Sequence, residues 1–232
     1  MGQGQTDRRI EEQVWRALGW DSRVEDEGLG VQVRDGMATL LGTTPSYASK
    51  LAAEEAVQQV PGIVDVVDQV EVVVPAADRH EDAEIADAIE TTFQWNPLVP
   101  AERIRCAVVD GWVTLGGTVD LLCESKDAER AVYGLEAVRG VSNEIRIGGP
   151  DVDSRVLRRE IMDALERHAR REATRIEIRV DAADVTLSGR VDSWSEKRTV
   201  LGVASHAPGV RAVHDALMID QYSAGAPVRR VG

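Results

Sequence analysis

The stretch VQVRDGMATLLGT at residues 31–43 returns as CAVVDGWVTLGGT at residues 106–118 and as IRVDAADVTLSGR at residues 178–190. The first two copies align without gaps at an offset of 75 residues, and the third follows the second at an offset of 72. The same offsets hold for apolar positions on both sides of the stretch. One register kept over most of a chain indicates tandem copies of a single structural unit.

Within each copy, apolar residues alternate with polar ones on both sides of a turn. Asp-Gly stands at the turn at 35–36 and at 110–111, and this pair between alternating hydrophobics predicts a β-hairpin. The third copy has Ala182-Ala183 there, so its turn should have a different geometry. One glycine at a matched position is expected to end each second strand: Gly42, Gly117 and Gly189.

A helix is predicted on each side of the hairpin. Upstream, apolar residues at a spacing of four form one stripe, and a short polar residue near the start can cap free N–H groups. These capping residues are Asp7, Asp82 and Ser154. Downstream, helices are expected at 46–60, 121–135 and 193–207, with Pro-Gly pairs ending the first and third at Gly62 and Gly209.

A last strand follows in each copy, so the order is α-β-β-α-β. The apolar stripes require both helices on one face of a three-stranded mixed sheet. The fold class is therefore α+β with three tandem domains. Their expected extents are 7–75, 79–149 and 152–222, followed by a flexible tail at 223–232.

This pattern resembles that of the BON domain family of bacteria. The matching runs are V-x-V-x-D-G-x-[AV]-T-L-x-G-T at 31–43 and 106–118, V-T-L-S-G at 185–189 and P-G-V-R-A-V at 208–213. The resemblance covers nearly the whole chain. It implies an αββαβ fold and a non-enzymatic module associated with phospholipid binding, envelope integrity and stress. It also implies that a small ion such as potassium can be a ligand, as in one cytoplasmic branch of the family.

Composition limits the class of partner. The chain has 232 residues and a net charge of −13, which argues against general nucleic-acid binding. The sequence shows no secretory signal, no convincing lipidation signal and no transmembrane stretch, so we expect a cytoplasmic protein that can lie at the inner membrane surface. Two cysteines are too few for a disulfide framework and are expected to act as small buried hydrophobes.

The charge is unevenly distributed. Residues 1–77 and 78–150 each carry −7, whereas residues 151–232 carry +1. Arginines concentrate on and after the first helix of the third unit, and they are candidates for binding anionic lipid or a protein partner. They are Arg158, Arg159, Arg167, Arg170, Arg171 and Arg175. The alternative is a solvated helix with i,i+4 pairs, Arg159 with Asp163 and Glu166 with Arg170.

The outer faces of the sheets are a second candidate interaction surface. Alternation places apolar side chains on the face away from the helices in the first two units, and a face meant only for water should be polar. We expect these side chains, and two tryptophans after first helices, to pack between domains or between subunits. The candidates are Met37, Leu41, Val109, Trp112, Trp20 and Trp95. The tryptophans can equally close their own cores.

No catalytic or metal-ligand constellation stands out, and no cofactor is expected. The four histidines have no metal-ligand spacing, and most carboxylates fall on solvated helix faces. Two hypotheses follow. The first is a binding protein that acts at anionic phospholipid or on a partner protein during stress. The second is a self-assembling structural protein, with a small ion such as potassium as a further ligand.

Overall fold

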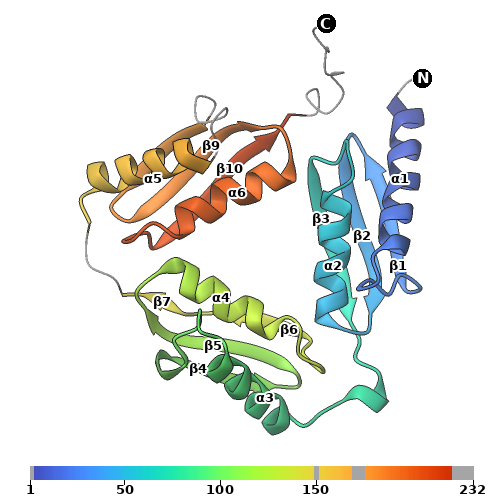
Figure 1. Cartoon of the computed structure of the whole chain (residues 1–232). Coiled ribbons are helices and arrows are strands. Elements are labelled where there is room, and N and C mark those ends of the chain that lie inside the picture. The colour runs from blue at the N-terminus through green and yellow to red at the C-terminus, as the bar shows by residue number, and fades with distance from the viewer. Residues whose placement is uncertain (1–2, 149–151, 169–175, 221–232) are drawn as a thin grey trace, which may run out of the picture.

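The computed structural model describes residues 3–148, 152–168 and 176–220. Three α+β domains follow one another along these ranges, each with its own mixed sheet, two covering helices and hydrophobic core (Figure 1). The fold class predicted from the repeat is confirmed.

The elements of the three domains occur in the same order. The first domain contains α1 (Gln3–Trp20), β1 (Leu29–Arg34), β2 (Met37–Thr44), α2 (Tyr47–Gln58) and β3 (Asp65–Val72). After a 3₁₀ turn (Ala76–Asp78), the second contains α3 (Asp82–Trp95), a 3₁₀ turn (Ala101–Arg103), β4 (Ile104–Val109), β5 (Trp112–Val119), α4 (Leu122–Val132), β6 (Gly140–Asn143) and β7 (Arg146–Ile147). The third contains α5 (Ser154–His168), β8 (Ile176–Asp181), β9 (Asp184–Val191), α6 (Trp194–Ser205) and β10 (Ala212–Ile219).

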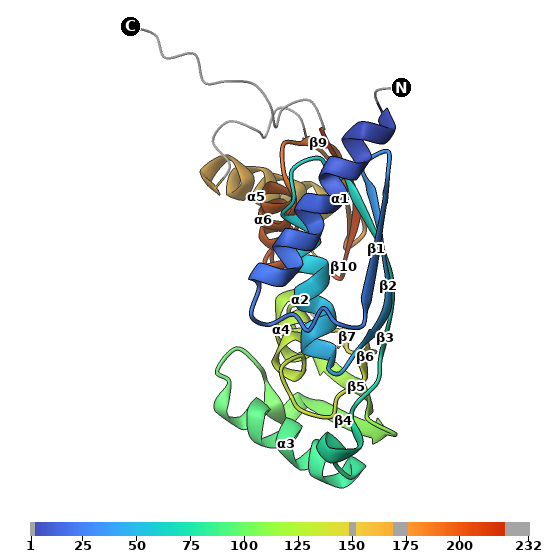
Figure 2. The ribbon, with the colours of Figure 1, turned by 90° about the vertical axis from the view of Figure 1, so that its right-hand side faces the viewer.

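The hairpin strand that follows the turn is central in every sheet. β2 pairs antiparallel with β1 and parallel with β3, and β9 does the same with β8 and β10. In the second domain the last strand is divided, so β5 pairs with β6 and then with β7. Figure 2 shows α1 and α2 on one face of the first sheet, which leaves the other face uncovered by the domain's own helices. The stripe residues Val14, Ile89 and Ile161 are all fully buried beneath their helices.

The described hairpin turns have the backbone conformation that the sequence predicts, with one difference in the third domain. Asp35 and Gly36 both lie in the left-handed region, at φ 50° and 77°, as a type I′ turn requires. In the third domain Ala182 keeps this conformation at φ 53°, whereas Ala183 is not among the described residues with positive φ. The expected change in turn geometry therefore occurs at the second turn residue only.

Gly42 and Gly117 do not end their strands, contrary to the sequence-based expectation, because β2 and β5 continue for two more residues. Both lie at positive φ, 103° and 129°. A Cβ on Gly42 would collide with the carbonyl oxygen of Gly28, and one on Gly117 with that of Arg103. Glycine is needed where the loop before the hairpin crosses close to the central strand. Gly189 has the same φ of 129° inside β9.

An ion pair joins the second helix to the last strand in the first and third domains, and a neutral hydrogen-bonded pair takes its place in the second. Lys50 pairs with Asp68 at 2.9 Å, and Lys197 with Asp215 at 2.8 Å. At the matched positions the second domain has Ser125 and Asn143, hydrogen-bonded at 3.0 Å from Nδ2 to Oγ. Both partners change together, so no charge is left unpaired at this half-buried position.

The first residue of each second helix reaches into the next domain. Tyr47 packs against the core of the second domain and meets the Tyr133 ring edge-on at 5.5 Å. Leu122 packs against the core of the third domain. Trp194 returns to the first domain, where its Nε1 donates to the carbonyl of Ile63 at 3.2 Å.

The three domains thus close a ring within one chain, and α2, α4 and α6 face its centre (Figure 1). Two polar contacts support it: Lys126 Nζ donates to Ser205 Oγ at 2.8 Å, and Arg198 pairs with Glu55 at 2.9 Å. Head-to-tail contacts of one kind generate rings when the rotation closes.

Candidate functional site

Helix α5 presents part of the predicted arginine cluster to solvent. Leu157, Ile161 and Leu165 face the core, which turns the intervening positions outward. Arg158, Arg159 and Arg167 are all exposed. The other three arginines lie outside the described residues: Arg170, Arg171 and Arg175.

The exposed arginines of α5 are not held by neighbouring carboxylates. The expected i,i+4 ion pair between Arg159 and Asp163 is not formed, and the Glu166–Arg170 pair involves a residue outside the described ranges. No ion pair joins Arg158, Arg159 or Arg167 to another residue that the structure describes. Their guanidinium groups are therefore open to an external anion as far as the described part of the chain extends.

Arg167 also lines a groove between α5 and α6 with a volume of about 790 Å³. Apolar and polar residues both line the groove. Ala164, Val203 and Pro208 are among the apolar ones, and the polar ones include Arg167, His206 and two carboxylates, Glu160 and Asp163. The first domain has a groove at the matched place between α1 and α2, of about 580 Å³.

Arg167 occupies the same repeat position as Trp20 and Trp95, given the offsets of 75 and 72. Both tryptophans are almost fully exposed, at 88% and 84% of their surface. The expectation that they close their own cores is wrong. Each follows the last buried stripe residue, Leu18 or Phe93, by two positions, which turns the side chain about 200° away from the core.

The predicted sheet-face residues remain at the surface of the chain. Met37 is 45% exposed, Val109 68% and Trp112 53%, whereas Leu41 is half-buried. Val109 and Trp112 are cross-strand partners at the end of the β4–β5 hairpin. The contacts that join the domains come instead from the second helices. Packing of the sheet faces between subunits stays a prediction.

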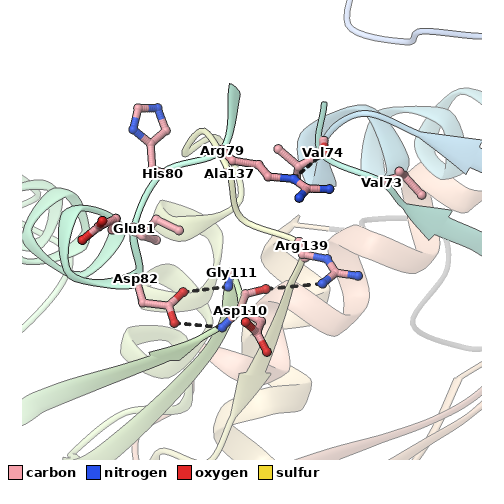
Figure 3. A pocket seen from close by; sticks show the side chains of 11 residues that line it. Val73, Val74, Arg79, His80, Glu81, Asp82, Asp110, Gly111, Ala137 and Arg139 are labelled. Carbon is pink, nitrogen blue, oxygen red and sulfur yellow. Dashed lines mark hydrogen bonds between the residues drawn. The ribbon is translucent and has the colours of Figure 1, made fainter. Parts of the chain in front are cut away.

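A separate cavity of about 430 Å³ lies where the first domain leads into the second (Figure 3). It forms at the start of α3, beside the β4–β5 turn. Both oxygens of Asp82 accept backbone N–H groups of this turn, from Asp110 and Gly111, each at 2.9 Å. Asp82 was expected to cap its own helix, but its carboxylate holds the hairpin turn against that helix.

Two arginines that no sequence pattern indicated line this cavity. Arg79 Nε donates to the Val74 carbonyl at 3.4 Å, and Arg139 Nη1 donates to the Asp110 carbonyl at 3.5 Å. The repeat offers no signal for Arg79, because the segment between domains varies. Its place in the cavity depends on the fold.

The described residues show no constellation for metal or thiol chemistry. No group of three or more His, Cys, Asp or Glu side chains within them could hold a metal ion. The free cysteines, Cys106 and Cys123, are half-buried, and burial raises the pKa of both thiols, which disfavours the reactive thiolate. No described helix combines the length and apolar character that crossing a membrane requires.

Comparison with known proteins agrees with the repeated αββαβ geometry. The model of the BON domain matches three segments, residues 6–74, 81–149 and 153–221. The chain belongs to the BON domain family. The expected resemblance is thereby confirmed over nearly the whole sequence. A curated BON relative, "Osmotically-inducible protein Y" of Escherichia coli (strain K12), is 25% identical over 154 residues, covering 63% of this chain and 75% of the relative.

Among solved structures, two concern CdsD, a structural protein of the type III secretion system of Chlamydia trachomatis. One is 13% identical, with 90% of this chain and 91% of that chain covered, at a TM-score of 0.25. The other, its C-terminal domain, is 13% identical with 90% and 96% covered, at a TM-score of 0.26. At these scores the likeness supports no inference about this BON protein.

Proposed function

We propose that this protein is a non-enzymatic BON-domain binding protein that attaches to anionic phospholipid surfaces through the ends of its first helices. The observation that carries the proposal is the matched position occupied by Trp20, Trp95 and Arg167, all of which are exposed. Together with Arg158 and Arg159, these side chains provide cationic and aromatic groups, the two kinds that bind at the surface of an anionic membrane.

The chemistry of each residue type fits the interface between water and lipid. Arginine binds headgroup phosphates with paired N–H donors, and each basic residue near an anionic surface contributes about 1 kcal/mol. Tryptophan places an apolar ring among acyl chains and keeps its N–H at the headgroups. The chain's net charge of −13 opposes such a surface, so binding requires the locally basic α5 to face it.

We further propose a role in bacterial stress, supported by family membership and by the osmotically inducible relative. Action at the cytoplasmic face of the inner membrane is part of the proposal. A protein partner with an acidic surface would use the same arginines.

Vesicle co-sedimentation tests the proposal. The parent protein should sediment with phosphatidylglycerol-containing vesicles and remain in solution with phosphatidylcholine alone. The triple variant Arg158→Glu, Arg159→Glu and Arg167→Glu should bind at least about tenfold more weakly, because three favourable charges become unfavourable. The double variant Trp20→Ser and Trp95→Ser should weaken binding even at low salt, where electrostatic attraction is strongest.

A charge-matched control distinguishes the effect of the α5 arginines on vesicle binding from the effect of the chain's net charge. Arg34, Arg105 and Arg146 are exposed arginines of the first two domains, and changing all three to Glu alters the net charge equally. This control should retain more vesicle binding than the α5 variant. Equal loss in both variants, or no binding by the parent, would contradict the proposal.

A second candidate function is self-association through the outer sheet face. The exposed cross-strand pair Val109 and Trp112 favours it, because paired large apolar side chains are rarely left to water. Light scattering at tens of micromolar should then show a mass above that of one chain, which Trp112→Ser reduces. A strict monomer at these concentrations would rule this function out.

A further inference from the structure

We propose that the cavity at the start of α3 binds a small phosphate ester with an apolar portion, through Arg79 and Arg139. This site is distinct from α5 and does not depend on the function proposed above. The cavity's volume of about 430 Å³ lies within the range typical of small-molecule pockets.

The two guanidinium groups keep most of their donors free. A guanidinium has five N–H donors, and each of these arginines uses one of them, on a main-chain carbonyl. Neither forms an ion pair with any residue in the described ranges. In the view of Figure 3 both guanidinium groups extend in the same direction, toward the side of the cavity formed by Val73 and Val74. Two such groups match the charge and the oxygen geometry of a phosphate dianion.

The acidic residues of the cavity are turned away or already used. Asp82 is occupied by the turn N–H groups. The Asp110 and Glu81 carboxylates point away from both guanidinium groups in Figure 3. His80 is engaged by two carboxylates, Glu84 at 3.3 Å and Glu136 at 3.6 Å. The positive charge of the two arginines is therefore not neutralised within the cavity.

The side chain of Arg139 passes close to Gly111 of the β4–β5 turn. Gly111 is at φ 75°, and a Cβ there would lie 3.2 Å from Cγ of Arg139, so the aliphatic stem crosses the turn where glycine leaves room.

The remaining wall of the cavity is apolar. It includes Val73, Val74, Ile85 and Ala137. Ala137 lies at φ 62°, where the other two domains have Gly62 and Gly209 at the matched position. A residue with a side chain in this conformation is strained, and such strain is concentrated at functional sites. Its methyl group adds apolar surface that glycine would not supply, which favours a ligand with an apolar portion.

Isothermal titration with phenyl phosphate tests the site, since this probe joins a phosphate dianion to an apolar ring. The full chain should bind it saturably and more tightly than inorganic phosphate. The double variant Arg79→Gln and Arg139→Gln should bind at least about tenfold more weakly, because both charged donors are lost. Ala137→Gly should weaken binding about threefold while relieving the backbone.

The control variant is Arg34→Gln with Arg105→Gln, which removes two exposed arginines from elsewhere and should bind phenyl phosphate like the parent. Saturable binding that survives loss of Arg79 and Arg139 would overturn the proposal, as would no binding by the parent at millimolar probe. Phosphatidylglycerol vesicles distinguish a lipid headgroup from a free ester. The Arg79 and Arg139 variant should sediment like the parent, and loss of sedimentation would overturn the small-molecule assignment.

Discussion

The indole Nε1–H of Trp194 donates a hydrogen bond to the main-chain carbonyl of Ile63 at 3.2 Å, across 131 residues of sequence. The contact joins the start of α6 in the third domain to the segment after α2 in the first. It completes a cycle in which Tyr47 and Leu122, at the matched positions, contact the second and third domains. The stability of each domain is thereby coupled to that of the other two.

Removal of this bond should destabilise the folded chain. Trp194→Phe keeps the aromatic ring but leaves the Ile63 carbonyl without its donor, so the free energy of unfolding should fall by about 1 kcal/mol. Urea denaturation measures this change. Trp20→Phe, at an 88% exposed position, is the matched control and should change stability little. Equal stability of the Trp194 variant and the parent would show that this hydrogen bond does not stabilise the folded chain.

The hairpin turn of the third domain offers a stabilising substitution. Ala182 is exposed and lies at φ 53°, a conformation that glycine adopts without strain. Ala182→Gly should raise the free energy of unfolding by about 0.5–1 kcal/mol. The neighbouring Ala183→Gly should lower it, because Ala183 is buried and outside the left-handed region. Thermal unfolding of both variants compares them directly, and the prediction fails if the two changes have the same sign.

The half-buried carboxyl group of Glu54 should make the free energy of unfolding depend on pH. Burial, with Asp68 nearby, raises the pKa of Glu54 above its ordinary value. The folded state thus holds the proton more tightly than the unfolded state, so this group lowers stability as pH rises through the ordinary glutamate pKa toward the folded-state pKa. Glu54→Gln should therefore be more stable than the parent at pH 7, with the difference shrinking as the pH falls below the ordinary value.

Urea unfolding of the Glu54 variant across this pH range provides the measurement. Glu71→Gln serves as its control, because the Glu71 side chain is exposed on β3. The control should show no comparable convergence with the parent at low pH. A stability difference for Glu54→Gln that stays constant with pH would contradict the assigned cause.

The middle domain permits a test of the exchanged polar pair. Asn143 Nδ2 donates to Glu129 Oε2 at 3.1 Å and to the Ser125 carbonyl at 3.1 Å. Asn143→Asp removes these donors and places a like charge beside Glu129, so stability at pH 7 should fall by about 2 kcal/mol or more. Adding Ser125→Lys recreates the pair of the other two domains and should recover part of that loss. A double variant no more stable than Asn143→Asp would show that the pair is not transferable.

Most of the fold was predictable because its signals are local and occur three times. Asp35 and Gly36 specify a turn through backbone conformation, and the stripe containing Val14 specifies which helix face is buried. The arginine face of α5 was also predictable, since alternation around Leu157 and Ile161 directs Arg158 and Arg159 outward. The glycines were misplaced relative to strand ends because the close approach of Gly42 to the carbonyl of Gly28 is a contact between separate segments.

The sequence by itself therefore determined the three αββαβ units, their cores and the charge difference between the third unit and the first two. Only the tertiary structure decided that the units close a ring and that Arg79 and Arg139 share one cavity. The physical reason is that hydrophobic periodicity and turn conformation depend on residues a few positions apart. Contacts such as that between Trp194 and Ile63 depend instead on how the surfaces of the three folded domains fit together, and short-range patterns do not encode that fit.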